Sequence, residues 1–493
     1  MSAHGMQTVP MVGDRDACYR ALRTRDARFD GRFFICVRST GVYCRPVCPA
    51  RPPKLENCVF LPSAAAAQEA GFRPCLRCRP EASPETFAWR GTSNTVSRAL
   101  RLIAEGALDE DDVEGLAGRL GVGDRHLRRL FDQHVGASPV AVAQTRRLLF
   151  AKRLIDETAL PMTEVALAAG FGSVRRFNAA VRCTYNRSPR ALRRLRALRG
   201  ADRTAVTLRL PYLPPYDWEN MVGFLAARAI PGVESMAGGV YRRTIACGRA
   251  HGVVTVRPAP GASHLVATIH VTEVAHLTGI VTRLRRLFDL DADVETIGEH
   301  LASDPRLAPL VAARPGLRVP GAWDAFELAV RAILGQQVSV AAATTFAGRL
   351  VAAHGRLLAT PVADDGLRFV FPEPQALAAA DLTTIGLTRA RARTLSSFAA
   401  VVAREPELLS TAPSLDAAVD RLSALDGIGD WTAQYIAMRA LREPDAFPAS
   451  DLGLRRALET PVGRPSTRAV LATAECWRPW RAYAVLHLWL GGA

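Results

Sequence analysis

Apolar and polar residues follow two different periods along the chain. From about residue 94 to 196, and again from about 296 to the end, apolar residues recur at helical spacing. Between these stretches, short runs rich in β-branched residues predict strands, with a helical pattern over Trp218–Ala229 among them. The predicted strands are Thr207–Leu210, Thr244–Cys247, Gly252–Arg257 and Leu265–Val271. The pattern predicts a multidomain chain that is mainly α-helical with α+β modules.

Breaks in composition divide the 493 residues into four predicted domains, which agrees with the usual ~100–200 residues per domain. A cysteine-rich segment ends in the proline-containing stretch Arg79–Glu85, and an arginine-rich stretch that ends at Arg196 closes the first helical region. The predicted domains are 1–90, 94–198, 205–295 and 296–493.

Charge is distributed unevenly over these domains. The formal net charge is +16, and +14 of it falls within the first 200 residues. Such a basic half is typical of a polyanion-binding protein, and equally of a solvated basic surface. No stretch approaches the ~20 apolar residues of a membrane span, and the first 25 residues lack the apolar core of a signal peptide. We therefore expect a cytoplasmic protein without a membrane partner.

Five of the ten cysteines fall between residues 44 and 78, and four of these form two closely spaced pairs. The pairs are Cys44-x3-Cys48 and Cys75-x2-Cys78. Two thiolate pairs on separate loops can close a tetrahedral site around Zn²⁺. In a reducing compartment such a cluster indicates metal ligation before disulfides, the alternative being a set of free cysteines. We expect one Zn²⁺ per chain and no organic cofactor.

The cysteine segment resembles the N-terminal domain of the Ada-type adaptive-response proteins over about residues 14–81. The resemblance implies that Cys44 accepts a methyl group from a methyl phosphotriester in DNA, while Cys44, Cys48, Cys75 and Cys78 hold the zinc. It also places Thr40, Arg51 and Arg73 near DNA phosphates, although both arginines could equally be solvated. Pro49 departs from the family, which usually has a basic residue there. The matching strings are Phe33–Gly41, Cys44–Cys48, Glu56–Asn57 and Ala70–Cys75.

Formal charge suggests what methylation would do. Zinc with four thiolates carries two net negative charges, and methylation of Cys44 removes one of them. DNA phosphates would repel the methylated site less, so we hypothesise that methylation strengthens DNA binding.

Two helix-turn-helix patterns lie in the basic region. In Val113–Phe131, a short helix is predicted to end at Gly121 and a second to open after Gly123, with Asp124 as N-cap. Leu127, Leu130 and Phe131 would face the core. A second copy spans Met162–Phe177. The side chains predicted to be exposed for DNA are Arg125, His126, Arg128 and Arg129 in the first copy, and Arg175, Arg176 and Asn178 in the second.

Two such units joined by a helix at about Val140–Glu157 resemble the AraC-type DNA-binding domain over about 94–197. Ala169–Ser173 and Ser188–Arg190 are the strings that carry the resemblance. It implies that the second helix of each unit enters a major groove of promoter DNA, with RNA polymerase as a further candidate partner. The alternative is a helical bundle without a DNA role.

The C-terminal half contains a helix-hairpin-helix signature, Leu425–Ala433, in which Gly427 and Gly429 allow a tight turn that presents backbone N–H groups to a phosphate. Asp451 follows after a loop. An aspartate there is usually an N-cap, but the pairing with the hairpin resembles the helix-hairpin-helix DNA glycosylases, in which this residue is catalytic.

Further strings narrow the resemblance to the AlkA-type 3-methyladenine DNA glycosylase II, over about 205–493. The strings include Pro215–Trp218, Gly223–Ala229, Arg314–Gly321, Arg331–Gln336 and Tyr483–Trp489. The resemblance implies that Trp431, Tyr435 and Trp489 line a pocket for a flipped-out base, whose positive charge aromatic faces attract. For Trp489 the alternative is core packing. Asp451 would stabilise positive charge on the sugar or orient the attacking water.

Two departures refine this expectation. Lyase-active relatives carry a lysine where Trp431 stands, which predicts base removal without strand cleavage. Gln337 occupies the position of the leucine wedge that fills the gap left in the DNA, and glutamine can also fill it and hydrogen-bond there.

We therefore predict a monomeric fusion of four parts: a small zinc domain, an AraC-type domain with two helix-turn-helix units, an α+β domain and a helix-hairpin-helix glycosylase domain. It would act on double-stranded, alkylated and promoter DNA, both as a transcriptional activator and as an enzyme that releases alkylated bases of the 3-methyladenine and 7-methylguanine type. Two alternatives are a transcription factor whose glycosylase half is an inactive DNA clamp, and a glycosylase whose zinc half is only a DNA anchor.

Overall fold

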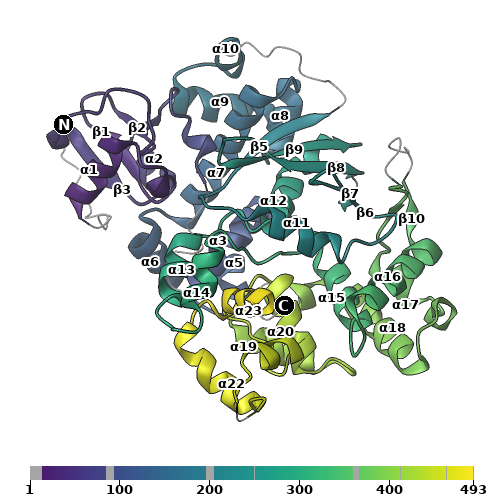
Figure 1. Cartoon of the computed structure of the whole chain (residues 1–493). Helices are drawn as coiled ribbons and strands as arrows, with labels where there is room; N and C mark the ends of the chain where they lie inside the picture. Colours follow the sequence, from purple (N-terminus) through teal and green to yellow (C-terminus); the bar gives the residue numbers. More distant parts are fainter. Residues whose placement is uncertain are drawn as a thin grey trace. The chain divides into compact units, whose positions relative to one another are not determined.

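The computed structural model describes residues 14–84, 94–195, 205–248, 250–358, 366–410, 412–461 and 463–491. The chain forms two compact units (Figure 1). Unit 1 comprises 1–214 with 274–282 and 290–292, and unit 2 comprises 215–273, 283–289 and 293–493. The predicted boundaries at residues 90 and 198 lie outside the described residues. Within the described ranges, no helix is long and apolar enough to cross a membrane.

Unit 1 begins with a small sheet that carries the cysteines. Its strands are β1 (Phe34–Val37), β2 (Val42–Cys44), β3 (Cys58–Leu61) and β4 (Arg73–Pro74), in the order β3-β1-β2-β4. Helix α1 is Arg15–Thr24, and α2 is Ala64–Glu69. Two small clusters of buried side chains form the core, and one of them includes Ala137 from the helical region that follows. The cysteine segment therefore does not fold around the metal ligands alone.

Eight helices follow in the described part of unit 1. They are α3 (Asn94–Ala104), α4 (Ala107–Glu110), α5 (Val113–Arg119), α6 (Asp124–Val135), α7 (Pro139–Glu157), α8 (Met162–Ala168), α9 (Val174–Tyr185) and α10 (Pro189–Arg194). Helices α5 and α6 are the first predicted helix-turn-helix, α8 and α9 the second, and α7 joins them. Leu127 and Phe131 are buried as predicted, and Leu130 packs against the same core. Strand β5 (Val206–Pro211) ends the unit's main segment.

One cap prediction is wrong. The N-cap of α6 is Gly123, which has extended backbone and offers no side-chain hydrogen bond, and Asp124 lies in the first turn. There its carboxylate pairs with Arg128 at 3.8 Å. Because no side chain caps α6, its first backbone N–H groups remain available to an anion.

Buried charges tie the cysteine segment to α7. Arg79 follows the cluster residue Cys78, and its guanidinium contacts Glu81 at 3.1 Å, Asp156 at 3.2 Å and Glu157 at 3.0 Å. Lys152 of α7 bonds Asp156 at 2.6 Å. These groups are nearly inaccessible to water, so loss of one partner would leave a buried charge uncompensated.

Unit 2 combines an antiparallel sheet with helices. Strands β6 (Glu234–Ala237), β7 (Val240–Cys247), β8 (Ala250–Pro258) and β9 (His264–Val271) pair with their sequence neighbours. Helix α11 is Trp218–Ala226, shorter at its C-terminus than predicted. Helix α12 (Leu277–Leu287) is divided, with residues 277–282 in unit 1 and 283–287 in unit 2. The later helices are α13 (Val294–Leu301), α14 (Ala308–Ala313), α15 (Ala325–Leu334), α16 (Val340–His354), α17 (Pro374–Ala378), α18 (Arg389–Arg404), α19 (Leu415–Ser423), α20 (Asp430–Arg439), α21 (Leu452–Ala457), α22 (Thr467–Ala474) and α23 (Arg481–Gly491). Two-residue strands β10 (Arg356–Leu357) and β11 (Phe369–Val370) pair between α16 and α17.

The predicted hairpin joins α19 to α20. Gly427 has a φ of +81°, and a Cβ there would lie 2.3 Å from Thr394 Oγ1, so both its backbone and its surroundings require glycine. Gly429 is the N-cap of α20, again without a side-chain cap. The hairpin is therefore a tight turn with free amides at a helix N-terminus.

A buried ionic cluster joins the sheet to α15. Arg243 of β7 donates to Glu327 at 2.7 Å, and Arg331 donates to Glu327 at 2.6 Å and also pairs with Glu234. Tyr241 donates its hydroxyl to Glu234 at 2.7 Å. Burial alone would raise the pKa of Glu234, but the guanidinium groups of Arg331 and Arg243 hold this pKa at about 2.

The cluster makes stability depend on pH. Because the pKa of Glu234 is lower in the folded chain, its stabilising effect is complete above the unfolded pKa, near 4.5, and is lost as pH falls toward about 2. We expect Glu234→Gln to destabilise unit 2 by roughly 3–5 kcal/mol at pH 7 and by progressively less below pH ~4.5. Urea unfolding at pH 7, 5, 4 and 3 measures this; a difference that does not change with pH would contradict it.

Candidate functional site

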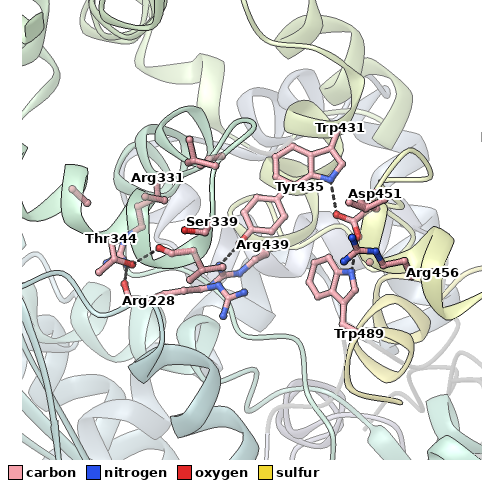
Figure 2. Close-up of a pocket in the computed structure, with 18 residues that line it drawn as sticks. Arg228, Arg331, Ser339, Thr344, Trp431, Tyr435, Arg439, Asp451, Arg456 and Trp489 are labelled. Atoms are coloured by element: carbon pink, nitrogen blue, oxygen red, sulfur yellow. Dashed lines mark hydrogen bonds between the residues drawn. The ribbon is translucent and has the colours of Figure 1, made fainter. Parts of the chain in front are cut away.

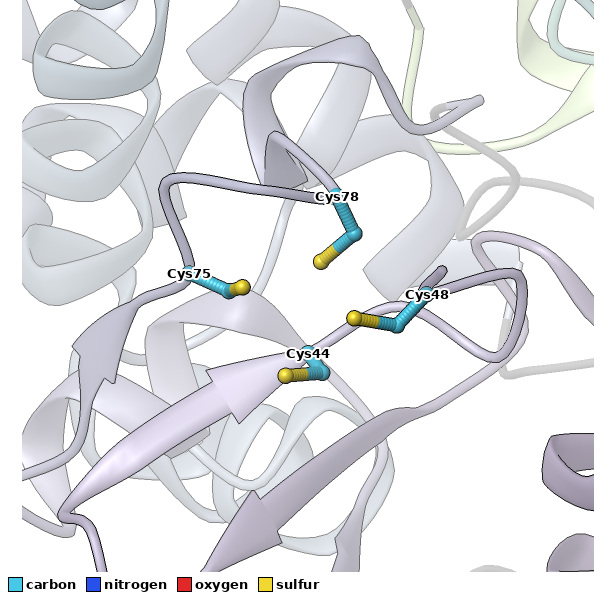
Figure 3. Close-up of side chains that lie close together, drawn as sticks. All are labelled: Cys44, Cys48, Cys75 and Cys78. Atoms are coloured by element: carbon cyan, nitrogen blue, oxygen red, sulfur yellow. The ribbon is translucent and has the colours of Figure 1, made fainter. Parts of the chain in front are cut away.

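The four predicted ligand cysteines come together in unit 1. Their sulfur atoms all lie within 4.8 Å of one another (Figure 3). Cys44 ends β2, Cys48 lies in the following loop, and Cys75 and Cys78 follow β4. The parallel pairing of β2 with β4 brings the two cysteine pairs side by side. Four converging thiols are a donor set that fits tetrahedral zinc.

Backbone amides distinguish the four sulfurs. The N–H of Arg45 donates to Cys78 Sγ at 3.3 Å, and that of Arg77 donates to Cys75 Sγ at 3.4 Å. Among the described residues, no such amide contact is found on Cys44 or Cys48. Cys48 is buried, whereas Cys44 is half-buried. Cys44 therefore combines partial exposure with a sulfur that accepts no backbone amide.

The predicted phosphate-contacting residues lie near this cluster on the chain. Thr40, Arg51 and Arg73 are exposed. Arg73 pairs in the sheet with Val42, two residues after Thr40. Pro49 stands where the Ada-type proteins usually have a basic residue. Here the guanidinium of Arg25 donates to the Pro49 carbonyl at 3.1 Å. A basic group therefore lies at this position although the residue itself is proline.

The predicted DNA-reading arginines are exposed on α6 and α9. Arg125, Arg128 and Arg129 lie on α6, where Arg129 contacts His126 at 3.1 Å. Arg175 and Arg176 lie on α9, where Asn178 is half-buried. The structure brings each set onto one helix, opposite that helix's buried residues.

A cavity of about 600 Å³ in unit 2 is lined by the residues predicted to act on the sugar and to hold the flipped-out base. Asp451, Trp431, Tyr435 and Trp489 all line it (Figure 2). Trp431 and Tyr435, one helical turn apart on α20, stack with ring centroids 5.3 Å apart, and Trp489 lies 6.5 Å from Tyr435. Trp489 is half-buried and faces the cavity, so it is not simply a core residue.

Asp451 is at once a cap and a cavity residue. Its Oδ1 accepts the N–H of Leu454 at 3.0 Å, which caps α21. The indole N–H of Trp431 donates to Oδ2 at 2.9 Å, and that of Trp489 donates to Oδ1 at 2.9 Å. The carboxylate therefore projects into the cavity with both oxygens held.

The cavity also contains arginines that the sequence analysis did not single out. Arg439 donates to the Tyr435 hydroxyl at 2.6 Å, and Arg228 lines the cavity on the side away from Asp451 (Figure 2). Burial would raise the pKa of Tyr435, but Arg439 and Arg228 lower it below its usual value. Arg439 lies four residues after Tyr435, so helical spacing could have indicated it. Arg228 follows the end of α11 and belongs to the matching string Gly223–Ala229, but the string alone did not indicate that its side chain lines the cavity.

Gln337 lies at the exposed turn between α15 and α16 and has a φ of +54°. Its neighbour Gln336, also missed, donates to the Gly427 carbonyl at 2.8 Å and to Thr432 at 3.1 Å. Through Gln336, the turn that carries Gln337 is hydrogen-bonded to the hairpin that contains Gly427 and Gly429. The turn and the hairpin are about 90 residues apart in sequence.

Comparisons with known proteins identify the domains to which these residues belong. Four family models match: the metal binding domain of Ada over 17–81, a helix-turn-helix domain over 116–195, the AlkA N-terminal domain over 207–324, and the HhH-GPD superfamily base excision DNA repair protein over 330–482. They confirm the predicted fold class. The Ada match and the four-cysteine cluster together fit one zinc ion.

Some relatives match nearly the whole chain, and others match only its C-terminal half. A probable bifunctional transcriptional activator/DNA repair enzyme AlkA from Mycobacterium tuberculosis is 47% identical over 486 residues, 97% of each chain. DNA-3-methyladenine glycosylase 2 of Escherichia coli is 40% identical over 57% of this chain and 95% of its own. The solved 3-methyladenine DNA-glycosylase from Archaeoglobus fulgidus is 25% identical with a TM-score of 0.50, covering 58% of this chain and 97% of that one. The chain thus belongs to the family of bifunctional transcriptional activator/DNA repair enzymes of the AlkA type, which joins an Ada metal-binding domain, a helix-turn-helix domain and a glycosylase.

Proposed function

We propose that unit 2 hydrolyses the N-glycosidic bond of alkylated bases in DNA, such as 3-methyladenine and 7-methylguanine. The observation that carries the proposal is the cavity in which the Asp451 carboxylate lies beside three aromatic side chains. A flipped-out base alkylated at a ring nitrogen is positively charged and is attracted to aromatic faces. Such a base leaves readily, so the enzyme needs chiefly to stabilise the sugar.

Asp451 acts on the sugar side of the bond. As the bond to the base breaks, electrons leave with the base and positive charge grows on the sugar ring. A fixed carboxylate stabilises that charge or orients the water that attacks the sugar. Among the described residues that line the cavity there is no lysine. No amine is therefore at hand to attack the sugar, which supports base removal without strand cleavage.

The hairpin and the Gln337 turn form the DNA-facing part of this proposal. The uncapped N-terminus of α20 and the glycine turn offer backbone N–H groups to a phosphate without side-chain charge. Gln337 would fill the gap left by the flipped nucleotide. Its left-handed backbone is typical of residues at functional sites.

We further propose that Cys44 is a single-turnover methyl acceptor. Its sulfur attacks the methyl carbon of a DNA methyl phosphotriester, an S–C bond forms, the C–O bond breaks, and the phosphodiester leaves as an anion. Zinc, when bound by the four cysteines, keeps the thiols deprotonated and nucleophilic. Cys44 is favoured because Cys75 and Cys78 each accept a backbone amide, which reduces their nucleophilicity, and because Cys48 is buried whereas Cys44 is half-buried.

The exposed arginines of α6 and α9 complete a regulator that reads promoter DNA, with RNA polymerase as a candidate partner and a monomer as the expected form. An inactive clamp in unit 2 would not need Asp451 held at both oxygens. A zinc segment that is only an anchor would not need a sulfur left free of backbone donors.

The glycosylase proposal predicts that Asp451→Asn slows excision at least a hundredfold, because an amide carries no charge to stabilise the sugar. Purified protein is incubated with methylated duplex DNA, and free bases are counted. Binding of the same duplex serves as the folding control. Full excision by the variant, or none by well-folded wild-type protein, contradicts the proposal.

The methyl-acceptor proposal predicts that wild-type protein gains one methyl group on Cys44 when mixed with DNA that contains methyl phosphotriesters. Peptide mass mapping locates the group. Removal of zinc with a chelator should prevent the transfer, whereas Cys183→Ser, at an exposed cysteine outside the cluster, should not. A methyl group on Cys75 instead would overturn the assignment.

The regulatory proposal predicts tighter promoter binding after methylation, because the cluster loses one negative charge. Dissociation constants of the methylated and unmethylated protein are compared from low to high salt. The advantage should shrink as salt rises, since screening weakens the repulsion that methylation relieves. Equal affinities of the methylated and unmethylated protein for promoter DNA at low salt would contradict the proposal.

A further inference from the structure

Three segments far apart in the sequence converge on one carboxylate. Trp431 in α20 and Trp489 in α23 point their indole N–H groups at different oxygens of Asp451, each at 2.9 Å (Figure 2). The third donor is the backbone N–H of Leu454, at 3.0 Å. All three donors are uncharged, so they orient the carboxylate without cancelling its negative charge.

We propose that Trp431 and Trp489 are positioning residues, whose indole N–H groups fix the Asp451 carboxylate in the plane and orientation that excision requires. This role belongs to the edges of the indoles and is separate from any stacking of a base on their faces. The inference rests on the proposed glycosylase function of Asp451.

Indole suits this role for a chemical reason. Its N–H is a donor only and stays neutral at any accessible pH. A carboxylate bound at one oxygen can still rotate about its Cβ–Cγ bond, whereas donors on both oxygens prevent the rotation. A charge that is already oriented stabilises a developing positive charge without reorganisation during the reaction.

Gly453 provides an independent indication that the contact is built into the site. A Cβ at Gly453 would lie 3.0 Å from Asp451 Oδ1, 3.2 Å from Trp489 Cδ1 and 3.4 Å from Trp489 Nε1. The backbone of Gly453 is not left-handed. The absence of a side chain, rather than conformational freedom, is therefore what the site uses at this position.

The Trp431 indole is itself held in place. It stacks on Tyr435 with an interplanar angle of 12°, and the Tyr435 hydroxyl accepts from Arg439. Arg439 also donates to the carbonyls of Pro320 and Gly321, at 2.8 Å and 3.0 Å. A chain of contacts from buried backbone to Asp451 thus fixes the donor before a substrate arrives.

The test removes the indole N–H of one tryptophan and keeps the shape of its ring. In the full chain, Trp431 or Trp489 is replaced by β-(3-benzothienyl)alanine, in which sulfur takes the place of the indole N–H and the ring shape is kept. Single-turnover excision of 7-methylguanine at saturating protein should slow roughly tenfold to a hundredfold. The dissociation constant for the same duplex should change less than about threefold. The same analogue at Trp218, whose N–H bonds a backbone carbonyl outside the cavity, is the matched control.

Gly453→Ala gives a second route, because the added methyl group intrudes on the bond between Trp489 and Asp451. Combining it with the Trp489 analogue should cost no more than about twofold beyond the larger single effect, since both changes break one bond. Unchanged excision rates in both analogues, or losses confined to the dissociation constant, would show that the tryptophans act only as pocket walls. If wild-type protein releases no base, the proposed function itself fails; if it does and the analogues match it, only this inference fails.

Discussion

Three hydrogen bonds hold the carboxylate of Asp451 at a cavity that three aromatic side chains also line, and the helices of unit 2 around it are arranged accordingly. Helix α21 begins at this residue, α20 and α23 each supply an indole donor, and Gly453 leaves space for one of them. Half-buried charge is costly unless hydrogen bonds replace water. The three donors provide that replacement while leaving the negative charge intact.

The cavity rests on an ionic layer as well as on packing. Arg331 lines the cavity and pairs with Glu234 and Glu327, and Arg439 orients Tyr435. Burial lowers the pKa of Arg228, which lies on the side away from Asp451. The lining therefore combines arginine guanidinium groups, three aromatic side chains and the Asp451 carboxylate.

In unit 1, the cysteine cluster and the helix-turn-helix domain share one compact unit. Arg79, next to Cys78, is bound to three carboxylates, two of which belong to α7, the helix that joins the two helix-turn-helix units. Ser63 of the cysteine segment also donates to the Val135 carbonyl at the end of α6, at 2.8 Å. The cysteine segment is thus bound to α7 and to the C-terminal end of α6.

The sequence by itself determined the architecture and the cysteine cluster, because these depend on local periodicity and on short motifs. Its resemblance to the AlkA-type glycosylases implied the cavity residues Asp451, Trp431, Tyr435 and Trp489. It misplaced the cap of α6, where a glycine with extended backbone precedes Asp124. Only the tertiary structure decided that Arg228, Gln336 and Gly453 belong to the site. Gln336 meets Gly427 across 91 positions of the chain, and Gly453 lies beside Trp489 of α23. Such long-range packing leaves no periodic trace in the chain.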